Sequence, residues 1–427
     1  MVSETVDAGA AYGGGSKQNE DSPEKRQEDN VFYDMTFAEF FAGIGLMRIG
    51  LEKEGWRAVF ANDIAEDKFE LYAGHFGEKN SHFLLKDIHN IDSDQIPTVT
   101  MATASFPCND LSVAGMREGL GGKQSSAYWG FVRILDEMGN RRPPIVLLEN
   151  VAGFLSSHGG KDFQEALLAL NRLGYAVDAM IIDASHFVPQ SRVRLFVIGI
   201  LNQSHTNSEI AETLTFWESP VRPKALARFM FLHPEIVWNI RDAAPLPKFT
   251  SSFPDVLENL SENSPLWWNP KRRDYLISQM SKKHAEQLQK MKAGKNWSYG
   301  TVFRRVRKGR TMAELRTDGF AGCLRTPRGG SARQILVQAG DGIVKVRLLT
   351  PRECARLMGA DNFVMKDVPL NRALFGFGDA VCVPVVSWIA KNYLNPIIDE
   401  MMIEKDSHDS PDNPAKSEVV CLVAGKR

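Results

Sequence analysis

The hydrophobic positions between residues 35 and 200 form short apolar runs, which alternate with longer segments whose apolar residues recur every three to four positions. The runs predict buried strands, and the longer segments predict helices that pack on a sheet. Their alternation is typical of an α/β fold with a doubly wound, mostly parallel sheet. The predicted strands are Met35 to Phe40, Arg57 to Asn62, Thr98 to Ala104, Ile145 to Glu149, Ala176 to Asp183 and Leu195 to Ile200. The predicted helices include Leu46 to Glu54 and Asp162 to Leu173.

The pattern changes after Ile200, where Pro, Trp and Asn residues interrupt the periodicity, as in Pro265 to Asp274. Helical periodicity returns in Pro351 to Met358 and in Val381 to Tyr393. The first 31 residues hold almost no large apolar side chains, so they cannot offset the entropy cost of ordering. We therefore expect a disordered tail at 1–31, a first domain at 32–200, a smaller inserted domain at 201–345, a return to the first domain at 346–400 and a mobile tail at 401–427.

Composition places the chain among ordinary globular proteins, with 43% hydrophobic and 24% charged residues in a length of 427. No apolar run approaches the roughly 18 residues that span a bilayer, and the N-terminus lacks the order of a signal peptide. The five cysteines are an odd number without C-x-x-C spacing, which argues against a disulfide framework or a zinc ribbon. We expect a cytoplasmic protein that has no membrane segment and no metal site.

Charge is distributed unevenly, although the whole chain carries a formal net charge of only −1. Residues 271–333 hold 17 Lys and Arg against 4 Asp and Glu, a net of +13, which leaves −14 for the remainder. A solvated surface is one interpretation of such a run. The aromatic residues Trp267, Trp268, Trp297 and Tyr299 in and beside it favour the other, which is binding of a polyanion such as DNA or RNA.

A glycine-containing turn follows the first predicted strand, in the sequence FFAGIGL from Phe40 to Leu46. Gly43 and Gly45 allow the backbone to approach a ligand closely. Asp63 follows the second strand, where its carboxylate can accept hydrogen bonds from ribose hydroxyls. A plain strand-to-helix turn is the alternative. A dinucleotide fingerprint would need a third glycine at Arg48, so a nicotinamide cofactor is disfavoured. Asp87 follows another apolar patch and could reach an adenine amino group or simply cap a helix.

Two further strand ends carry reactive groups. Cys108 lies in SFPCNDLS, among polar residues at the predicted carboxyl edge of the sheet, where it is either a nucleophile or a small buried hydrophobe. Cys354 and Cys382 lie in apolar helical settings and fit the second description. Glu149 ends the apolar run IVLLENV, where a desolvated carboxylate is suited to hold or give a proton.

Two arginines, Arg192 and Arg194, alternate as they enter the strand in PQSRVRLFVIG. Alternation places both guanidinium groups on one side of a strand. Each could be a surface arginine, but the pair leading into a buried strand indicates recognition of a planar, oxygen-rich group.

Together these residues resemble the DNA (cytosine-5) methyltransferases of the bacterial restriction-modification type. The resemblance covers about residues 35–200 and 345–395. The matching motifs, in the family's order, are FAGIG at 41–45, PC at 107–108, ENV at 149–151, QSRVR at 190–194, PRECARLMG at 351–359 and GDAV at 378–381. The resemblance implies an S-adenosylmethionine-dependent methyltransferase fold, in which 32–200 and 346–400 are catalytic and 201–345 is the target-recognition domain.

The resemblance also implies the chemistry. Cys108 would add to carbon 6 of a flipped-out cytosine, Glu149 would hold or donate the proton at N3, and Arg192 and Arg194 would orient the base. The methyl donor would be S-adenosyl-L-methionine. The cofactor-binding residues would be Phe41, Gly43, Gly45, Asp63, Ile64, Asp87, Ile88, Pro107 and Asp379. The loop from about Val113 to Ser126 looks like a mobile loop that closes over DNA.

One departure from the family pattern concerns Asp379, which stands where an asparagine usually follows the glycine. A carboxylate near the methionine carboxylate of the cofactor would be repulsive unless a cation or the cofactor's amino group compensates for it.

For the inserted domain we expect arginines and lysines to contact DNA. They are Arg304, Arg305, Arg307, Lys308, Arg325, Arg328 and Arg333. The expected partner is double-stranded DNA, bound by a monomer associated with the nucleoid, and a cognate restriction endonuclease that acts separately is left open. Two alternatives remain: an RNA such as a tRNA as substrate, and a non-catalytic DNA-binding relative that keeps the fold.

Overall fold

The computed structural model describes residues 34–77, 82–107, 127–201, 218–307, 309–326, 333–366 and 368–409, with only the backbone described for 404–409. The chain divides into Met1–Phe32, which lies outside the described residues, and Tyr33–Arg427, which holds every described element. The tail expected at 1–31 and the loop expected at 113–126 also lie outside them.

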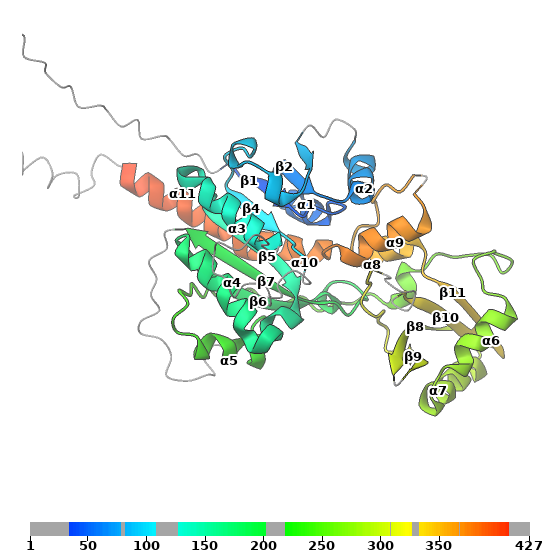
Figure 1. Ribbon diagram of the computed structural model, residues 1–427. Coiled ribbons are helices and arrows are strands. Elements are labelled where there is room, and N and C mark those ends of the chain that lie inside the picture. Colours follow the sequence, from blue (N-terminus) through cyan, green and yellow to red (C-terminus); the bar gives the residue numbers. More distant parts are fainter. Residues whose placement is uncertain are drawn as a thin grey trace, which may run out of the picture. The chain divides into compact units, whose positions relative to one another are not determined.

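A seven-stranded sheet forms the centre of the larger unit (Figure 1). Its strands are β1 (Thr36–Phe40), β2 (Arg57–Asp63), β3 (Phe83–Leu85), β4 (Met101–Ala104), β5 (Ile145–Val151), β6 (Tyr175–Asp183) and β7 (Val193–Leu201). They lie in the order β3-β2-β1-β4-β5-β7-β6. All neighbours are parallel except that β7 runs antiparallel to both β5 and β6. The predicted mostly parallel α/β fold is confirmed.

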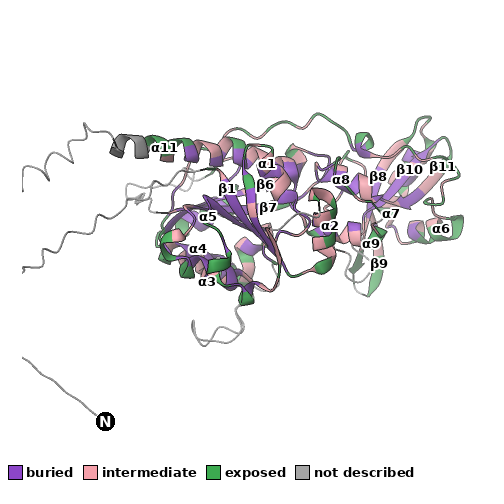
Figure 2. Cartoon of the chain, turned by 90° about the horizontal axis from the view of Figure 1, so that it is seen from above, coloured by how far each residue is buried: buried purple, intermediate pink, exposed green. Residues whose placement is uncertain are grey.

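Helices cover both faces of this sheet, because its strands are apolar on both sides (Figure 2). On one face the core includes residues of α1 (Leu46–Glu52), α8 (Pro351–Leu357), α9 (Leu370–Asp379), α10 (Val383–Ile389) and α11 (Asn395–Asp409). On the other face it includes residues of α3 (Ala127–Glu137), α4 (Lys161–Arg172) and α5 (Lys224–Leu232). A further helix, α2 (Glu66–Phe76), contacts β2 and α9.

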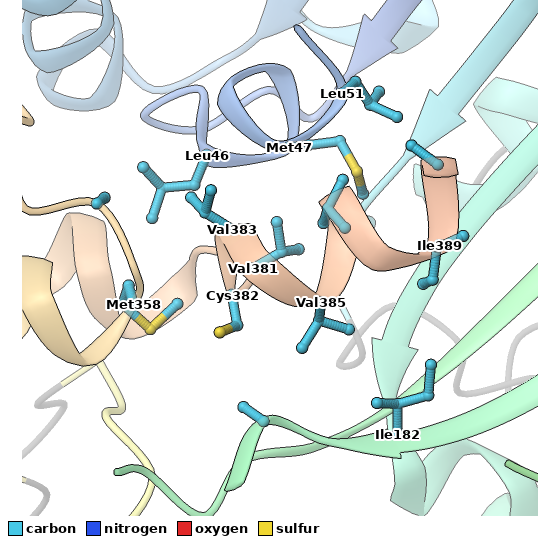
Figure 3. Close-up of a cluster of buried hydrophobic side chains, with 14 of the residues drawn as sticks. Leu46, Met47, Leu51, Ile182, Met358, Val381, Cys382, Val383, Val385 and Ile389 are labelled. Atoms are coloured by element: carbon cyan, nitrogen blue, oxygen red, sulfur yellow. The ribbon is translucent and has the colours of Figure 1, made fainter. Parts of the chain in front are cut away.

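The helices α1 and α10 are in close contact. This contact fixes both helices beside the glycine-containing turn that follows β1. A Cβ at Gly50 would lie 2.6 Å from Cβ of Val386, so only glycine permits this approach. Figure 3 shows Leu46 and Met47 of α1 facing Val383 of α10 across the buried cluster. The predicted helix from Val381 to Tyr393 is divided, since α10 passes into the π-helical turn η11 (Ala390–Leu394).

One helical run among the described residues, Leu370–Ile403, is long and apolar enough to cross a membrane by composition alone. The apolar runs of the sequence had not indicated it. In the structure, 72% of its apolar window is buried within the fold. Packing against the main sheet therefore accounts for its apolar character.

A second, antiparallel sheet follows in the inserted region, in the order β11-β10-β8-β9. Its strands are β8 (Ser298–Arg307), β9 (Arg310–Arg316), β10 (Ile335–Gly340) and β11 (Ile343–Leu348), and α6 (Pro270–Ser278) and α7 (Lys282–Ala293) share its core.

Three domain limits expected from the sequence need adjustment. The limit at residue 345 falls inside β11. Within 201–345, α5 packs on the main sheet through Leu226 and Met230. The C-terminal helix α11 continues to Asp409, whereas a mobile tail was expected from residue 401, because the buried Ile397 and Ile398 anchor that helix to the core.

Candidate active site

A pocket of about 560 Å³ lies at the carboxyl ends of β1, β2, β4 and β5, the edge where open α/β sheets bind ligands. Eight of the residues predicted for catalysis or cofactor binding line it: Phe41, Gly43, Asp63, Ile64, Pro107, Glu149, Arg194 and Asp379. The fold thus brings together groups from strand ends that are far apart in the chain.

The turn after β1 has a special backbone conformation. Phe41, Gly43 and Gly45 all have positive φ angles, of 57°, 58° and 83°. Asp63 holds this turn, because its two carboxylate oxygens accept hydrogen bonds from the backbone amides of Gly43 (2.8 Å) and Ala65 (2.9 Å). For a non-glycine residue such as Phe41 this conformation is strained, and such strain gathers at functional sites.

Gly45 does not line the pocket, contrary to the expectation of direct cofactor contact. A Cβ there would lie 2.4 Å from Cε2 of Phe76 and 2.9 Å from the ring of Tyr72. The glycine is therefore needed for packing of α1 against α2 and for its left-handed backbone at the start of α1.

Asp87 and Ile88 are not brought to the pocket either. The Asp87 carboxylate accepts a hydrogen bond from the backbone amide of His89 (3.0 Å) and caps the short helix η1 (Ile88–Asn90). Ile88 is buried in the core on the α3 side of the sheet. Asp87 therefore fits the helix-cap alternative in this structure, and its contact with adenine stays a prediction. Ile64, by contrast, lines the pocket with 67% of its surface exposed, so it offers an apolar side chain to a ligand.

Glu149 and Arg194 meet on the pocket wall. The Nε atom of Arg194 lies 3.0 Å from Oε1 of Glu149, and both side chains are largely buried. The antiparallel pairing of Val151 with Arg194 places the two side chains at one end of the sheet. The site therefore presents a carboxylate beside a guanidinium, which can together hold a planar group with adjacent donors and acceptors.

Arg192 has a different place from the one predicted, because it does not line the pocket. Its side chain is 1% exposed and donates to the carbonyl oxygens of Leu324 (2.8 Å) and Gly378 (3.2 Å), and also to that of Ala380. The expectation that it contacts the base is thus corrected. Arg192 joins β7 to two segments that border the pocket.

A cation lies beside Asp379, the residue that stands where the family usually has an asparagine. This cation can compensate for the negative charge of the Asp379 carboxylate. The Nζ atom of Lys68 on α2 lies 3.3 Å from Oδ2 of Asp379, and the hydroxyl of Thr326 donates to Oδ1. All three residues line the pocket. Lys68 and Thr326 were not predicted, because a helical lysine and a loop threonine form no motif with an aspartate distant in sequence.

Glu39 was also missed. It lies inside β1, is 2% exposed and lines the pocket, and neither carboxylate oxygen has a hydrogen-bond partner among the described residues. Burial raises the pKa of this carboxyl to about 8, although the nearby Arg48 opposes the shift. A single acidic residue in the apolar run TFAEF was the available signal.

The predicted nucleophile, Cys108, lies outside the described residues, directly after the pocket residue Pro107 in the chain. Cys354 and Cys382 are buried, and burial raises the pKa of both thiols, that of Cys382 to about 12. They match the description as small hydrophobes. Within the described ranges, no group of three His, Cys, Asp or Glu residues could hold a metal ion.

Three of the five predicted DNA-contacting arginines that the structure describes lie on the β8–β9 hairpin. Arg305 and Arg307 extend from one face and both pair with Glu314, at 3.1 Å and 2.9 Å, while Val306 is 66% exposed. Arg304 belongs to the same strand. A two-stranded ribbon of this kind fits the major groove of DNA.

The other predicted DNA contacts are scattered. Arg325 lines the pocket, with its guanidinium 5.7 Å from the ring centre of Phe303, whereas Arg333 donates to Asn371 (2.7 Å). Lys308 and Arg328 lie outside the described residues.

Comparison with known proteins agrees with this geometry. Residues 35–395 match the model of the C-5 cytosine-specific DNA methylases. Type II methyltransferase M.DsaV of Dactylococcopsis salina is 28% identical over 365 residues, which are 85% of this chain and 87% of that protein. Type II methyltransferase M.HhaI of Haemophilus parahaemolyticus is 27% identical over 369 residues, which are 86% and 96% of the two chains.

A solved structure supports the fold. The S. pombe Dnmt2 methyltransferase aligns with a TM-score of 0.56 at 18% identity, covering 85% of this chain and 98% of that one. The resemblance seen in the sequence motifs is confirmed by the family match over most of the chain. The chain therefore belongs to the C-5 cytosine-specific DNA methylases, enzymes that methylate carbon 5 of cytosine in DNA.

Proposed function

We propose that this chain transfers a methyl group from S-adenosyl-L-methionine to carbon 5 of a flipped-out cytosine in a specific double-stranded DNA sequence, through a covalent intermediate on Cys108. The proposal rests mainly on the ion pair between Glu149 and Arg194. This pair lines the same pocket as Phe41 and Pro107. Relatives named type II methyltransferases favour a role as the modification enzyme of a restriction-modification system, or as a solitary methyltransferase.

The described pocket fits the cofactor in size and in chemistry. Its volume of about 560 Å³ is within the range of small-molecule sites. Asp63 would accept hydrogen bonds from the ribose hydroxyls, beside the apolar Ile64. The carboxyl group of Glu39 has no hydrogen-bond partner among the described residues, and it would accept a hydrogen bond from the α-ammonium group of the cofactor. When bound, S-adenosylmethionine supplies the activated methyl group.

The protein's own groups would activate the base. Carbon 5 of cytosine is a weak nucleophile, so the Cys108 thiolate would add to carbon 6 while Glu149 donates a proton to N3. Arg194 would hold the O2 edge beside Glu149. Carbon 5, activated in this way, would take the methyl group, and S-adenosylhomocysteine would be the leaving group. Loss of the carbon-5 proton to a base, return of the N3 proton to Glu149 and breakage of the bond between sulfur and carbon 6 would then release the methylated base and regenerate Cys108.

DNA binding would use the inserted region. The ring of a stacked cytosine is inaccessible, so the base must leave the duplex at a cost of a few kcal/mol. Contacts of the basic β8–β9 hairpin with the duplex would offset part of that cost, and Arg325 lies between the hairpin residue Phe303 and the pocket.

The proposal is tested by incubating the full chain with methyl-labelled S-adenosylmethionine and either a DNA library or total RNA. We expect label on carbon 5 of cytosine in DNA, and none with Cys108→Ser. Label on RNA alone would favour the RNA alternative. Unchanged activity of Cys108→Ser would exclude the covalent route, and absence of label from folded protein would contradict the function.

A further inference from the structure

The charges that line the pocket bear on ligand binding. Four described acidic side chains border it, whereas the described cations are Lys68, Arg194 and Arg325. Arg194 pairs with Glu149. A cofactor that ends in an amino acid carries a carboxylate, and a pocket this acidic must supply a cation for it.

We propose that Lys68 binds the carboxylate of the cofactor's amino-acid end, and that Asp379 and Thr326 position the ammonium group of Lys68. This inference rests on the proposed function, because it takes S-adenosylmethionine as the ligand. It assigns roles in ligand binding to two residues, Lys68 and Thr326, that form no sequence motif.

The geometry of Lys68 suits this role. Lys68 lies in the first turn of α2, directly beyond the residues that follow β2, and its side chain remains 27% exposed. An ammonium group has three N–H donors. With one donor directed at Asp379, 3.3 Å away, the others can reach a second carboxylate in the same pocket.

Asp379 is fixed on both of its oxygens, one facing Lys68 and the other accepting the hydroxyl of Thr326. The backbone before it is fixed as well, since a Cβ at Gly378 would lie 2.6 Å from the backbone of Arg325 and Thr326. Asp379 therefore cannot easily turn away from the pocket. It keeps the ammonium group of Lys68 in place and restricts its rotamers, which reduces the entropy lost when a ligand binds.

This arrangement predicts strong coupling between the two charges. With Lys68 removed, the Asp379 carboxylate would face the ligand carboxylate without compensation, and the two like charges would repel each other. With both charges removed, the repulsion would disappear. The single and double substitutions should therefore be non-additive, as substitutions of contacting residues are.

The test measures binding by isothermal titration calorimetry, using the full chain. The probes are S-adenosylhomocysteine and its decarboxylated analogue, S-adenosyl-3-thiopropylamine, which keeps the ammonium group. Wild-type protein should prefer the first probe by about tenfold or more, the range expected for a hydrogen bond between charged groups. This comparison needs no variant and so does not depend on the folding of one.

Lys68→Met should weaken binding of S-adenosylhomocysteine by about tenfold to a hundredfold and leave the analogue nearly unaffected. Adding Asp379→Asn should restore the part of the loss that is due to repulsion between the two carboxylates. Lys224→Met, which removes an exposed lysine on α5 away from the pocket, is the matched control and should change neither affinity.

Equal affinity of the wild-type protein for both probes would overturn the inference. If Lys68→Met lost affinity for both probes equally, the role of Lys68 would be merely structural, and the inference would also be overturned. Wild-type protein that binds neither probe would instead contradict the proposed function.

Discussion

Nε of Arg194 lies 3.0 Å from Oε1 of Glu149 because β7 runs antiparallel to β5 and returns to the same end of the sheet. This single antiparallel insertion brings an ENV motif and a Q-x-R-x-R motif to one pocket wall. A buried ion pair of this kind adds little stability by itself, so its place in the pocket favours a functional role.

Glu149→Gln should reduce methyl transfer by about 10²- to 10⁴-fold, because the amide cannot donate a carboxylic proton to the base. The free energy of unfolding should change little, since glutamine can still hydrogen bond to Arg194. Single-turnover rates and urea unfolding test both statements.

The matched control is the buried pair of Arg347 and Glu353, which lies outside the pocket. Glu353→Ala should lower the free energy of unfolding by about 3 to 5 kcal/mol, since it leaves a buried guanidinium without its partner. Full activity of Glu149→Gln would remove the carboxylate from the mechanism.

Arg192→Met should destabilise the protein by about 3 kcal/mol or more, because it leaves the carbonyl oxygens of Leu324, Gly378 and Ala380 without a donor. Arg194→Met should cost less stability and more activity. Urea unfolding of both variants distinguishes the two roles, and a stable but inactive Arg192→Met would return that residue to the catalytic set.

Glu39 predicts a pH dependence of stability. Its folded pKa of about 8 lies above the ordinary value of 4.5, so the folded state holds a proton that the unfolded state releases between these values. The associated stability is complete below about pH 4.5 and is lost as pH rises through about 8, at about 1.4 kcal/mol per unit of pKa difference.

Glu39→Gln removes this titration, so its stability relative to wild type should rise between about pH 5.5 and about pH 8.5 in urea unfolding without cofactor. Glu137→Gln, at a more exposed carboxylate on α3, serves as the control. Stability curves that remain parallel over this range would show that Glu39 does not titrate there.

The hairpin arginines predict the salt dependence of DNA binding. Replacing Arg305, Arg307 and Arg310 with Gln should lower the slope of log K against log salt by about 0.9 for each DNA phosphate that is no longer neutralised. Arg57→Gln, on β2 of the main sheet, should leave the slope unchanged. An unchanged slope in the triple variant would place the DNA elsewhere.

Sequence patterns predicted the central strands within a few residues, because buried strands are continuous apolar runs. They could not show that β7 is antiparallel, since such a run looks the same in either direction. The second sheet was not predicted because β8 is buried only in its first half. Its last residues, Arg305, Val306 and Arg307, are all exposed, so the strand lacks a regular alternation of apolar and polar positions.

In the site, motifs at strand ends found Glu149, Arg194 and the turn held by Asp63. They gave no means of separating Arg192 from Arg194, because alternation fixes the side of a strand but not what covers it. Lys68 could not be found either, since its role depends on an ion pair with Asp379 that only the folded chain creates.

The most direct test of DNA cytosine-5 methylation is bisulfite sequencing of a plasmid from cells that express this chain. We expect protected cytosines within one recurring sequence context, and none in cells that express Cys108→Ser at equal levels. A plasmid with no protected cytosines, from cells that contain folded wild-type protein able to bind S-adenosylhomocysteine, would contradict this function.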